Sequence, residues 1–456
     1  MGALDLLASA AEYLPTIKKP ERRLSLTRRL AWTGLILAIY LVMSNVPLYG
    51  VPIQTATATT VTLMNIIFAS SLGTLMQLGI GPIVTAGLVL EVLVGAKLID
   101  LDLTDPEDQA KFTGAMKMLA VIFAVVEAVV VTLSGMFWPV GVSVSPLTKA
   151  LVVIQLVAAS YIVILMDEAL QRGWGIGSAI SLFILAMVAQ TVVWDMFGFV
   201  PRLAMDFGVV PALVYDKDPF IVFTRANGFP DVTGLLATFA IIVLLVYLQA
   251  MMVEIPVTSP QLRGIRTKVP LQFLYVTNIP VLLLAILVSD LQLFEAPIAR
   301  FLGTSSIWYK IYSDLVFYLS PPTGLVETVL NPLHSAIFAV SWILLSIAFG
   351  YVWVEVAGLN PSSQAESLVK GGLEVPGMRR NPKILEAMLS RYIYPLTTLS
   401  SVIVGIIAVV ASFFGAYGGG IGLLLAVGIV YQYYSLITYE RTLEAYPLIR
   451  RLLGER

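Results

Sequence analysis

Ten stretches of the chain are apolar over about 20 residues, the length that an α-helix needs to cross the hydrocarbon core of a bilayer. Polar or charged segments separate these stretches, so each predicts a membrane-spanning helix of its own. The predicted spans are residues 30–47, 79–98, 113–135, 147–167, 176–198, 231–254, 270–290, 333–356, 393–415 and 419–438. A further apolar stretch, residues 60–76, contains too many Thr, Ser and Asn residues to predict an eleventh span. The pattern predicts an all-α, polytopic membrane protein with ten transmembrane helices.

Composition agrees with this fold class. Of the 456 residues, 58% are hydrophobic and only 12% are charged, whereas soluble domains contain about 25% charged residues. A basic segment, KKPERRLSLTRR, precedes the first apolar run, and no convincing small-residue cleavage site follows that run. We therefore expect an uncleaved first span rather than a signal peptide.

Positive charge is distributed unevenly among the predicted loops. When the termini and the loops after the second, fourth, sixth and eighth spans are assigned to one side, that side holds most of the 28 Lys and Arg residues. Such residues accumulate on the cytoplasmic side of membranes, so both termini are predicted to be cytoplasmic. A span at residues 60–76 would destroy this alternation, and that segment is therefore expected to be a re-entrant or external helix.

The ten spans divide into two groups of five, separated by a long outward loop. Because five is odd, the second group enters the membrane in the opposite sense from the first, which is the topology of an inverted repeat with a pathway between its halves. The predicted organisation is a cytoplasmic N-terminal segment, an N-terminal half, an external loop, a C-terminal half and a cytoplasmic tail, at residues 1–29, 30–198, 199–230, 231–438 and 439–456.

Residue types that support catalysis or metal binding are scarce. The chain has no cysteine and one histidine, His334, which follows Pro332 at the start of a predicted span. It also has no P-loop motif, and the glycine-rich segment Arg172–Ser181 opens a span without a preceding strand, unlike a dinucleotide-binding loop. We predict no enzyme activity, no cofactor and no metal site.

Ion-coupled secondary transport with an inverted repeat is an alternative function for such a protein. Transporters of this kind place ionisable groups at the middle of the membrane. Most acidic residues here lie at the ends of the predicted spans, and Glu127 is the clear exception. One buried carboxyl group permits a transporter without favouring one.

Several motifs occur in an order that points to one family. They are GIGPIVTAG (Gly79–Gly87), RGWGIGSAISLFI (Arg172–Ile184), EIPV (Glu254–Val257), YVTNIPV (Tyr275–Val281), NPLH (Asn331–His334) and GAYGGGIGLLLAV (Gly415–Val427). With these motifs, ten spans and a basic loop between spans 8 and 9, the chain resembles the SecY family, the channel-forming alpha subunits of the Sec protein translocon. It is more similar to archaeal than to bacterial members.

The resemblance implies a channel that moves unfolded secretory polypeptides across the cell membrane and releases transmembrane segments sideways into lipid. It also implies two pseudo-symmetric inverted halves and a re-entrant plug helix at about residues 57–72. A hinge at Gly79, Gly81 and Pro82 would follow the plug, since Gly tolerates unusual dihedral angles and Pro suits the first turn of a helix. Non-helical backbone at this depth requires a cavity beside it.

Further site residues follow from the resemblance. The implied pore ring consists of six aliphatic residues, Ile80, Val84, Ile180, Ile184, Leu282 and Leu425. A ring of this kind would close a pore by excluding water and ions. The implied lateral gate, where spans 2 and 3 meet spans 7 and 8, carries Thr85, Glu127 and Asn278.

The implied partners are a SecE-type subunit, a small beta subunit, the ribosome, the nascent polypeptide with its signal sequence, and membrane lipid. Basic residues on two cytoplasmic loops are the candidates for binding ribosomal RNA through its phosphates. They are Arg263, Arg266, Lys268, Arg379, Arg380 and Lys383.

Overall fold

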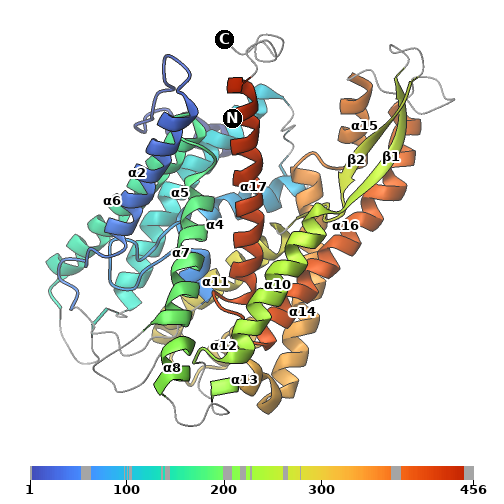
Figure 1. The fold of residues 1–456 in the computed structure, drawn as a ribbon. Coiled ribbons are helices and arrows are strands. Elements are labelled where there is room, and N and C mark those ends of the chain that lie inside the picture. The colour runs from blue at the N-terminus through green and yellow to red at the C-terminus, as the bar shows by residue number, and fades with distance from the viewer. Residues whose placement is uncertain are drawn as a thin grey trace.

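The computed structural model describes the fold of most of the chain. The described residues are 3–52, 63–96, 98–99, 101, 105–134, 137–138, 144–198, 208–215, 222–225, 229–259, 265–277, 279–370 and 382–445. Long helices run side by side, and short helices and one two-stranded sheet connect them (Figure 1). Among the described residues, nine helices are long and apolar enough to cross a membrane, and a shorter apolar helix, Gly81–Gly95, occupies the place of the second predicted span.

The helices that follow the predicted spans form two groups of five. The first half contains α2 (Leu26–Met43), α4 (Gly81–Gly95), α5 (Pro106–Ser134), α6 (Pro146–Gln171) and α7 (Ala179–Phe197). The second half contains α10 (Val232–Ala250), α11 (Ile279–Leu302), α14 (Pro332–Val356), α16 (Pro382–Phe413) and α17 (Gly420–Ala445). These ten helices confirm the predicted fold class.

Shorter elements lie between the spans and at the two ends of the bundle. They are α1 (Ala3–Ala11), α3 (Leu63–Ile67), α8 (Val209–Tyr215), α12 (Ile307–Leu319), α13 (Leu325–Leu330), α15 (Pro361–Lys370), β1 (Met252–Ser259) and β2 (Ile265–Gln272). The β1–β2 hairpin and the last turns of α17 lie at the upper end of Figure 1, which we name the hairpin end. Helices α8, α12 and α13 lie at the opposite end, which we name the α12 end.

The largest errors in the predicted span boundaries are in the seventh and ninth spans. The seventh span begins at Ile279 rather than at residue 270, because residues 265–272 form β2, which pairs antiparallel with β1 from Met252↔Gln272 to Ser259↔Ile265. The ninth begins at Pro382 rather than at residue 393. Its early turns bury Leu385 and Leu389, one helical turn apart, against α15 and the base of the hairpin, so this part of α16 is amphipathic rather than uniformly apolar.

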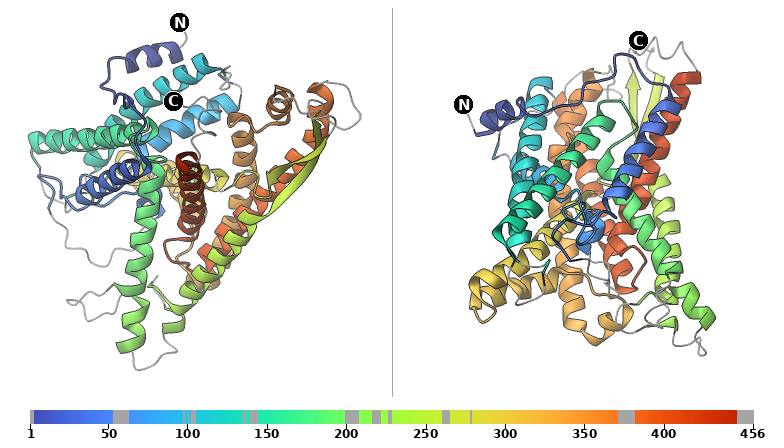
Figure 2. Two further views of the ribbon diagram at one scale, coloured as in Figure 1. Left: turned by 45° about the horizontal axis from the view of Figure 1, so that its top comes forward. Right: turned by 90° about the vertical axis from the view of Figure 1, so that its left-hand side faces the viewer.

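Helix α11 occupies the centre of the bundle. It packs against α3, α4 and α5 as well as α14, α16 and α17, and residues from both halves form one continuous apolar core around it. Figure 2 shows the two groups of helices on either side of this region. Contacts made by α11 therefore join the two halves.

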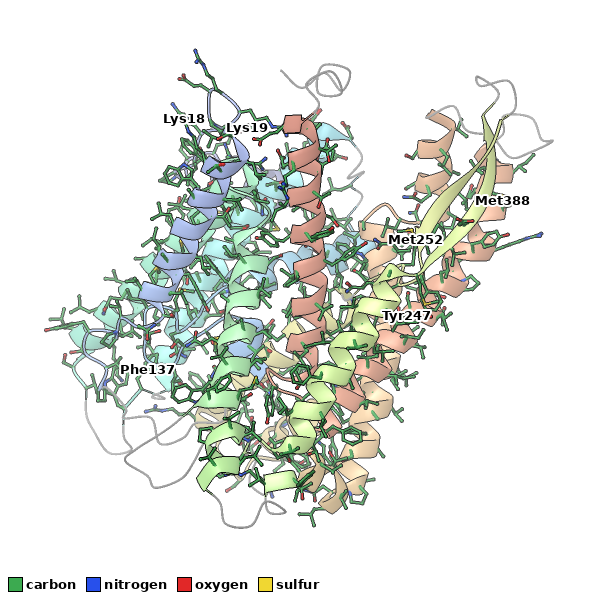
Figure 3. The ribbon with its side chains drawn as sticks, viewed as in Figure 1. Lys18, Lys19, Phe137, Tyr247, Met252 and Met388 are labelled. Atoms are coloured by element: carbon green, nitrogen blue, oxygen red, sulfur yellow. The ribbon has the colours of Figure 1, made fainter. Side chains whose placement is uncertain are left out.

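The outer surface carries large apolar side chains. On α10, for example, Leu236, Phe239, Val243 and Tyr247 are exposed, and Figure 3 shows Tyr247 on the outer face. A surface of this composition is suited to lipid rather than water. Lys18 and Lys19 lie at the hairpin end of the molecule (Figure 3).

Candidate functional site

The break before α4 lies where the sequence predicts a hinge. Gly79 has φ of 55°, and a Cβ atom there would collide with the carbonyl oxygen of Phe68. The next amide, of Ile80, donates a hydrogen bond of 2.7 Å to the same oxygen. Helix α4 then starts at Gly81, with Pro82 in its first turn, where no intrahelical partner is needed for the missing N–H. Only glycine therefore fits position 79 without moving Phe68.

The segment before this break lies between the two halves. Residues 57–62 of the predicted plug lie outside the described residues, and residues 63–72 contain α3 followed by turns. Ile66, Ile67, Phe68 and Ala69 are buried, and α3 contacts both α7 and α11. Tyr40 donates a hydrogen bond to the carbonyl of Ala69 at 3.2 Å. The segment is thus packed inside the bundle and is not a surface amphipathic helix.

Four of the six predicted ring residues line one cavity of about 620 Å³: Ile180, Ile184, Leu282 and Leu425. The remaining lining is more polar and includes Gln249, Gln272, Gln432, Ser435 and Tyr439. Gln249 and Gln272 lie at the ends of α10 and β2, so the cavity extends toward the hairpin end. Polar side chains therefore share the lining with apolar ones such as Leu274 and Leu436 toward that end, whereas the four predicted ring residues are all aliphatic.

The other two ring residues belong to α4 and the turn before it. Ile80 is completely buried beside Phe68, and Val84 is half-buried one turn later. Ile184 and Leu425 are also buried. The predicted ring thus draws residues from both halves, from the turn before α4 and from α4, α7, α11 and α17, although Ile80 and Val84 do not line the cavity.

The start of α7, which carries Ile180 and Ile184, is held by a buried carboxylate that sequence reasoning missed. Asp167, on α6, accepts hydrogen bonds from the amide of Ala179 at 2.8 Å and from the hydroxyl of Ser178 at 2.8 Å. A carboxylate at this position satisfies free N–H groups and complements the helix dipole. In the sequence Asp167 is one of several acidic residues at the ends of predicted spans, and no local pattern signals its role as a cap on another helix.

The loop before α7, Arg172–Ser178, is also bound by α2 and α17. Thr33 accepts a hydrogen bond from the amide of Ile176 at 3.0 Å, and Arg29 donates to the carbonyl of Gly175 at 2.9 Å. Tyr433, on α17, donates to the carbonyl of Ser178 at 2.9 Å. The glycine-rich motif thus positions α7 relative to the second half, which accounts for it without phosphate binding.

The predicted gate residues Thr85 and Glu127 lie beside α11, but the residue that they meet there is Asp290. Thr85 donates to the two carboxylate oxygens of Asp290 at 3.0 and 3.1 Å. Glu127 is buried close to Asp290, and neither of its carboxyl oxygens has a hydrogen-bond partner. Asn278 lies outside the described residues, so its part in the gate stays a prediction.

Asp290 was missed because the predicted seventh span ended there. In the structure α11 runs from Ile279 to Leu302, which places Asp290 in its middle. The segment before α11 is anchored by Tyr275, which donates a hydrogen bond of 2.6 Å to the carbonyl of Leu359. Burial raises the pKa of Tyr275 to about 12, so its hydroxyl stays protonated and remains a donor.

The two halves also meet toward the hairpin end of α4. A Cβ atom at Gly95 would lie 2.9 Å from side-chain atoms of both Val352 and Val356 on α14. This close approach depends on the absence of a side chain at position 95. Together with Thr85 and Asp290, it holds α4 against α11 and α14.

The basic residues predicted to bind RNA are described only in part. Arg263, Arg379 and Arg380 lie outside the described residues. Arg266 and Lys268 lie in β2, opposite Thr258 and Pro256 of β1, and Lys383 is exposed in the first turn of α16. Both β2 and the start of α16 lie at the hairpin end (Figure 1).

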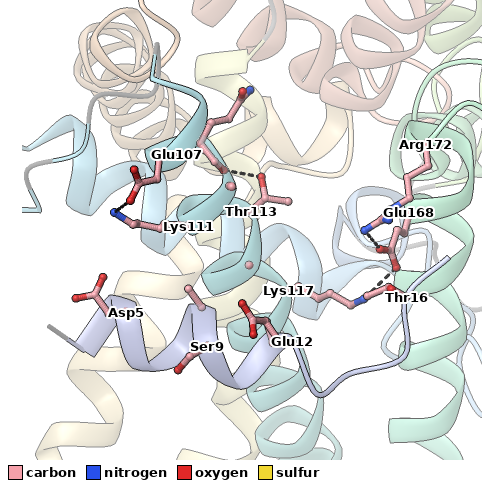
Figure 4. Close-up of a pocket in the computed structure, with 15 residues that line it drawn as sticks. Asp5, Ser9, Glu12, Thr16, Glu107, Lys111, Thr113, Lys117, Glu168 and Arg172 are labelled. Carbon is pink, nitrogen blue, oxygen red and sulfur yellow. Dashed lines mark hydrogen bonds and ion pairs between the residues drawn. The ribbon is translucent and has the colours of Figure 1, made fainter. Parts of the chain in front are cut away.

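A larger pocket, of about 720 Å³, lies between α1, α5 and α6 (Figure 4). Glu168 forms ion pairs there with Lys117 at 3.0 Å and Arg172 at 2.6 Å. Lys117 also donates to the carbonyl of Pro15 at 3.0 Å. These contacts fasten the N-terminal segment to α5 and α6, and none of the predicted site residues lines the pocket.

The single histidine has a structural environment. The His334 ring stacks on Phe317 with centroids 4.3 Å apart, and its Nε2 lies 3.1 Å from the carbonyl oxygen of Ser320. No group of three or more His, Asp or Glu side chains suited to a metal ion occurs within the described ranges.

Comparisons with known proteins agree with this arrangement. The SecY family model matches residues 74–434, and the model for the plug domain of Sec61p matches residues 39–73. The chain is 59% identical to protein translocase subunit SecY of Aeropyrum pernix, covering 100% of this chain and 99% of the relative. It is 36% identical to the subunit of the same name from Methanocaldococcus jannaschii, covering 97% and 98%.

Solved structures give the same result. One described as "The structure of a protein conducting channel" is 34% identical, with a TM-score of 0.80, and the match covers 98% of this chain and 99% of that chain. Another, "Sec61 in the Canine ribosome-channel complex from the endoplasmic reticulum", is 34% identical, with a TM-score of 0.77 and the same coverage. The chain therefore belongs to the SecY family.

Proposed function

We propose that the chain is the channel-forming subunit of a protein translocase. It moves unfolded secretory polypeptides across a cell membrane and releases transmembrane segments sideways into lipid. The observation that carries this proposal is the cavity between the two halves, which extends toward the hairpin end with several polar side chains and is also lined by the aliphatic residues Ile180, Ile184, Leu282 and Leu425. The buried segment around α3 lies between the halves and supports a closed resting state.

The chemistry of the cavity suits an extended polypeptide. Glutamine, serine and tyrosine side chains can exchange hydrogen bonds with a passing backbone without selecting a sequence. The aliphatic ring offers no hydrogen bonds, so water and ions are excluded when its side chains meet. A translocating chain would push these side chains aside and displace the plug, and the hinge at Gly79, Gly81 and Pro82 would let the plug move without moving α4.

The sideways route runs between α4 and α5 on one side and α11 and α14 on the other. Thr85 and Asp290 hold this boundary through one polar contact, and Glu127 adds an unpaired carboxyl group beside it. Hydrogen bonds between transmembrane helices contribute about 0.6 kcal/mol on average and up to about 2 kcal/mol. The apolar surface of a signal sequence can offset contacts of this strength.

Partners and orientation belong to the same proposal. The hairpin end faces the cytoplasm together with both termini, and the ribosome docks there on the β1–β2 hairpin and on the loop that contains Arg379 and Arg380. The canine Sec61 structure is described as part of a ribosome-channel complex, which supports this partner. A SecE-type subunit and a small beta subunit complete the complex, and residues 199–230 form an external loop between the two halves.

Secondary transport has less support. The Glu127 and Asp290 carboxyl groups are the feature that favours it, because buried acids can carry ions or protons. They lie at the boundary between α4, α5 and α11, whereas the cavity lies at the ring and does not include them. Membership of the SecY family likewise favours the channel.

A reconstituted assay tests the proposal. The complex is inserted into vesicles, and ribosomes translate a secretory precursor in their presence. Protease-protected precursor is then measured, and a matched precursor with charged residues in its signal core serves as the control. We expect protection only with the intact signal. Equal protection of both precursors, or none with either, would reject the channel.

A further inference from the structure

A second polar contact across the gate lies near the α12 end, about 15 Å along α11 from Asp290 at 1.5 Å per residue. Arg300, in the last turn of α11, donates hydrogen bonds from Nη1 to the carbonyl oxygens of Leu133 at 3.1 Å and Ser134 at 2.8 Å. Both acceptors belong to the last turn of α5. Arg300 therefore joins the end of α11, in the second half, to the end of α5, in the first.

The chemistry of this contact is that of a helix C-cap supplied by another helix. The last four carbonyl groups of an α-helix lack intrahelical partners, and that end carries the negative pole of the helix dipole. A guanidinium group donates hydrogen bonds to these carbonyl groups, and its positive charge is attracted to the negative pole of the dipole. Because the acceptors are backbone atoms, the contact depends on where α5 ends relative to α11 and not on any side chain of α5.

Arg300 is exposed, unlike Thr85 and Glu127. The attraction between an exposed charge and a helix terminus is weakened by solvent and salt, so this contact can break at little cost. The buried contact at Asp290 and the exposed contact at Arg300 lie on one continuous helix. Helices α4 and α5 pack against each other, and separating this pair from α11 must break both contacts.

We propose that Arg300 is a specificity-determining residue that closes the outer part of the gate by capping α5, and so sets how apolar a signal sequence must be to enter. The proposal rests on the proposed function. A signal sequence inserts its apolar surface between the gate helices and replaces their contacts. Every contact that closes the gate raises the apolar surface that the signal must offer, so loss of the cap admits weaker signals.

The test replaces Arg300 in the full complex and measures translocation of precursors whose signals form a graded hydrophobic series. Arg300→Gln removes the charge, and Arg300→Lys keeps it. Lys310→Gln is the matched control, because Lys310 is an exposed cation on α12 at the same end of the protein. For the weakest signals we expect Arg300→Gln to raise translocation about two- to fivefold, the range of a charge at a helix terminus. Arg300→Lys and Lys310→Gln should match the wild type.

Salt separates this role from a merely structural one. Raising the ionic strength should admit weaker signals in the wild type and have little effect in Arg300→Gln, where the charge is already absent. If Arg300 only stabilised the fold, the variant would lower translocation of strong and weak signals alike. The inference would be overturned if Arg300→Gln needed the same minimum signal hydrophobicity as the wild type, in vesicles where the wild type translocates. The proposed function would then remain intact.

A distance measurement gives a readout that does not depend on translocation. The chain has no cysteine, so spin labels can be attached at Val129→Cys on α5 and Phe301→Cys on α11, both exposed positions. Electron paramagnetic resonance of the resting complex should give a longer and broader distance distribution in the Arg300→Gln background. Identical distributions in both backgrounds would show that Arg300 does not hold these helix ends together.

Discussion

Thr85 donates a hydrogen bond to Asp290 across the boundary between the two halves, and 205 residues separate the two in the chain. The contact involves the middle of α11 and the second turn of α4, just after the break at Gly79. It thus connects the two structural features on which the proposed channel depends, the hinge before α4 and the boundary through which a segment would leave.

Removing this hydrogen bond should make the gate easier to open. Thr85→Val keeps the size of the side chain but leaves the Asp290 carboxylate without its donor, so the closed state loses the contact. For weak signals we expect translocation to rise about threefold, from about 0.6 kcal/mol per hydrogen bond between transmembrane helices. Translocation by the graded signal series measures the effect.

Thr132→Val is the matched control for this variant. Thr132 is as deeply buried on α5, but its hydroxyl oxygen has no hydrogen-bond partner. The same chemical change there removes no contact. The minimum signal hydrophobicity needed for translocation should therefore equal that of the wild type. Equal shifts in both variants would mean that loss of a hydroxyl group, and not loss of the bond to Asp290, changes the gate.

Gly79→Ala should displace the plug segment. A left-handed conformation costs a residue with a Cβ atom roughly 1–2 kcal/mol, and the new methyl group would also collide with the Phe68 carbonyl oxygen. Gly73→Ala is the control, because Gly73 has φ of 73° but open space around its Cβ position. Both variants should lower the thermal unfolding temperature, and only Gly79→Ala should raise resting ion conductance. Resting ion conductance in Gly79→Ala as low as in the wild type would contradict the role assigned to the hinge.

The sequence predicts those parts of this fold that depend on local composition. Apolar runs of about 20 residues located the ten spans, and the Gly and Pro residues before α4 located the break. The start of α11 was misplaced because the apolar segment 270–277 extends the run, although this segment forms turns after the last three residues of β2. The strand conformation of β2 depends on pairing with β1, which a hydropathy pattern does not contain.

Contacts between distant segments could not be predicted in the same way. Asp290 and Asp167 each look like an acidic residue at the end of a span, and only the packing of α4 on α11 and of α7 on α6 gives them partners. Arg300 caps a helix whose end lies more than 160 residues earlier, as the separation of 166 from Ser134 shows. Single-sequence patterns carry no information about such pairs.

The apolar ring should keep the resting channel closed. The test is a triple variant that combines Ile80→Ser, Ile184→Ser and Leu425→Ser. It places hydroxyl groups where apolar side chains would exclude water, so ion conductance in planar bilayers should rise. Deleting residues 57–70 in the same variant removes the predicted plug and should raise conductance further. Ile154→Ser, at an exposed position of α6, controls for a polar residue on the lipid face. A non-conducting triple variant without its plug would mean that these residues do not line a pore.

We expect two arginines of the predicted cytoplasmic loops to contribute to ribosome binding at the hairpin end. Arg263→Glu with Arg379→Glu removes two candidate phosphate contacts, so affinity should fall and its dependence on salt concentration should flatten by roughly one unit of log–log slope per lost contact. Lys18→Glu with Lys19→Glu makes the same charge change elsewhere at that end and should have a smaller effect (Figure 3). Co-sedimentation with ribosomes over a salt series provides the measurement, and equal slopes in all three proteins would exclude these loops as the RNA contact.

Asp167→Ala should make the resting channel conduct ions, although Asp167 does not line the cavity, because the substitution removes the cap that fixes the start of α7. Loss of a capping side chain costs about 1–2 kcal/mol, so the thermal unfolding temperature should fall. Ile180 and Ile184 follow directly after the capped residues and line the cavity, so their positions should become less defined and resting ion conductance should rise.

Asp231→Ala separates this effect from general instability. Asp231 caps α10 in a similar way, accepting a hydrogen bond of 2.7 Å from the amide of Gly234, but α10 contributes none of the six ring residues. Both variants should lose stability to a similar extent, and only Asp167→Ala should conduct ions. Asp167→Asn retains a side-chain oxygen that can accept a hydrogen bond from the amide of Ala179, so its resting ion conductance should stay close to that of the wild type. If Asp231→Ala conducted as strongly as Asp167→Ala, the leak would report weakened folding, and Asp167 would have no particular role in positioning the ring.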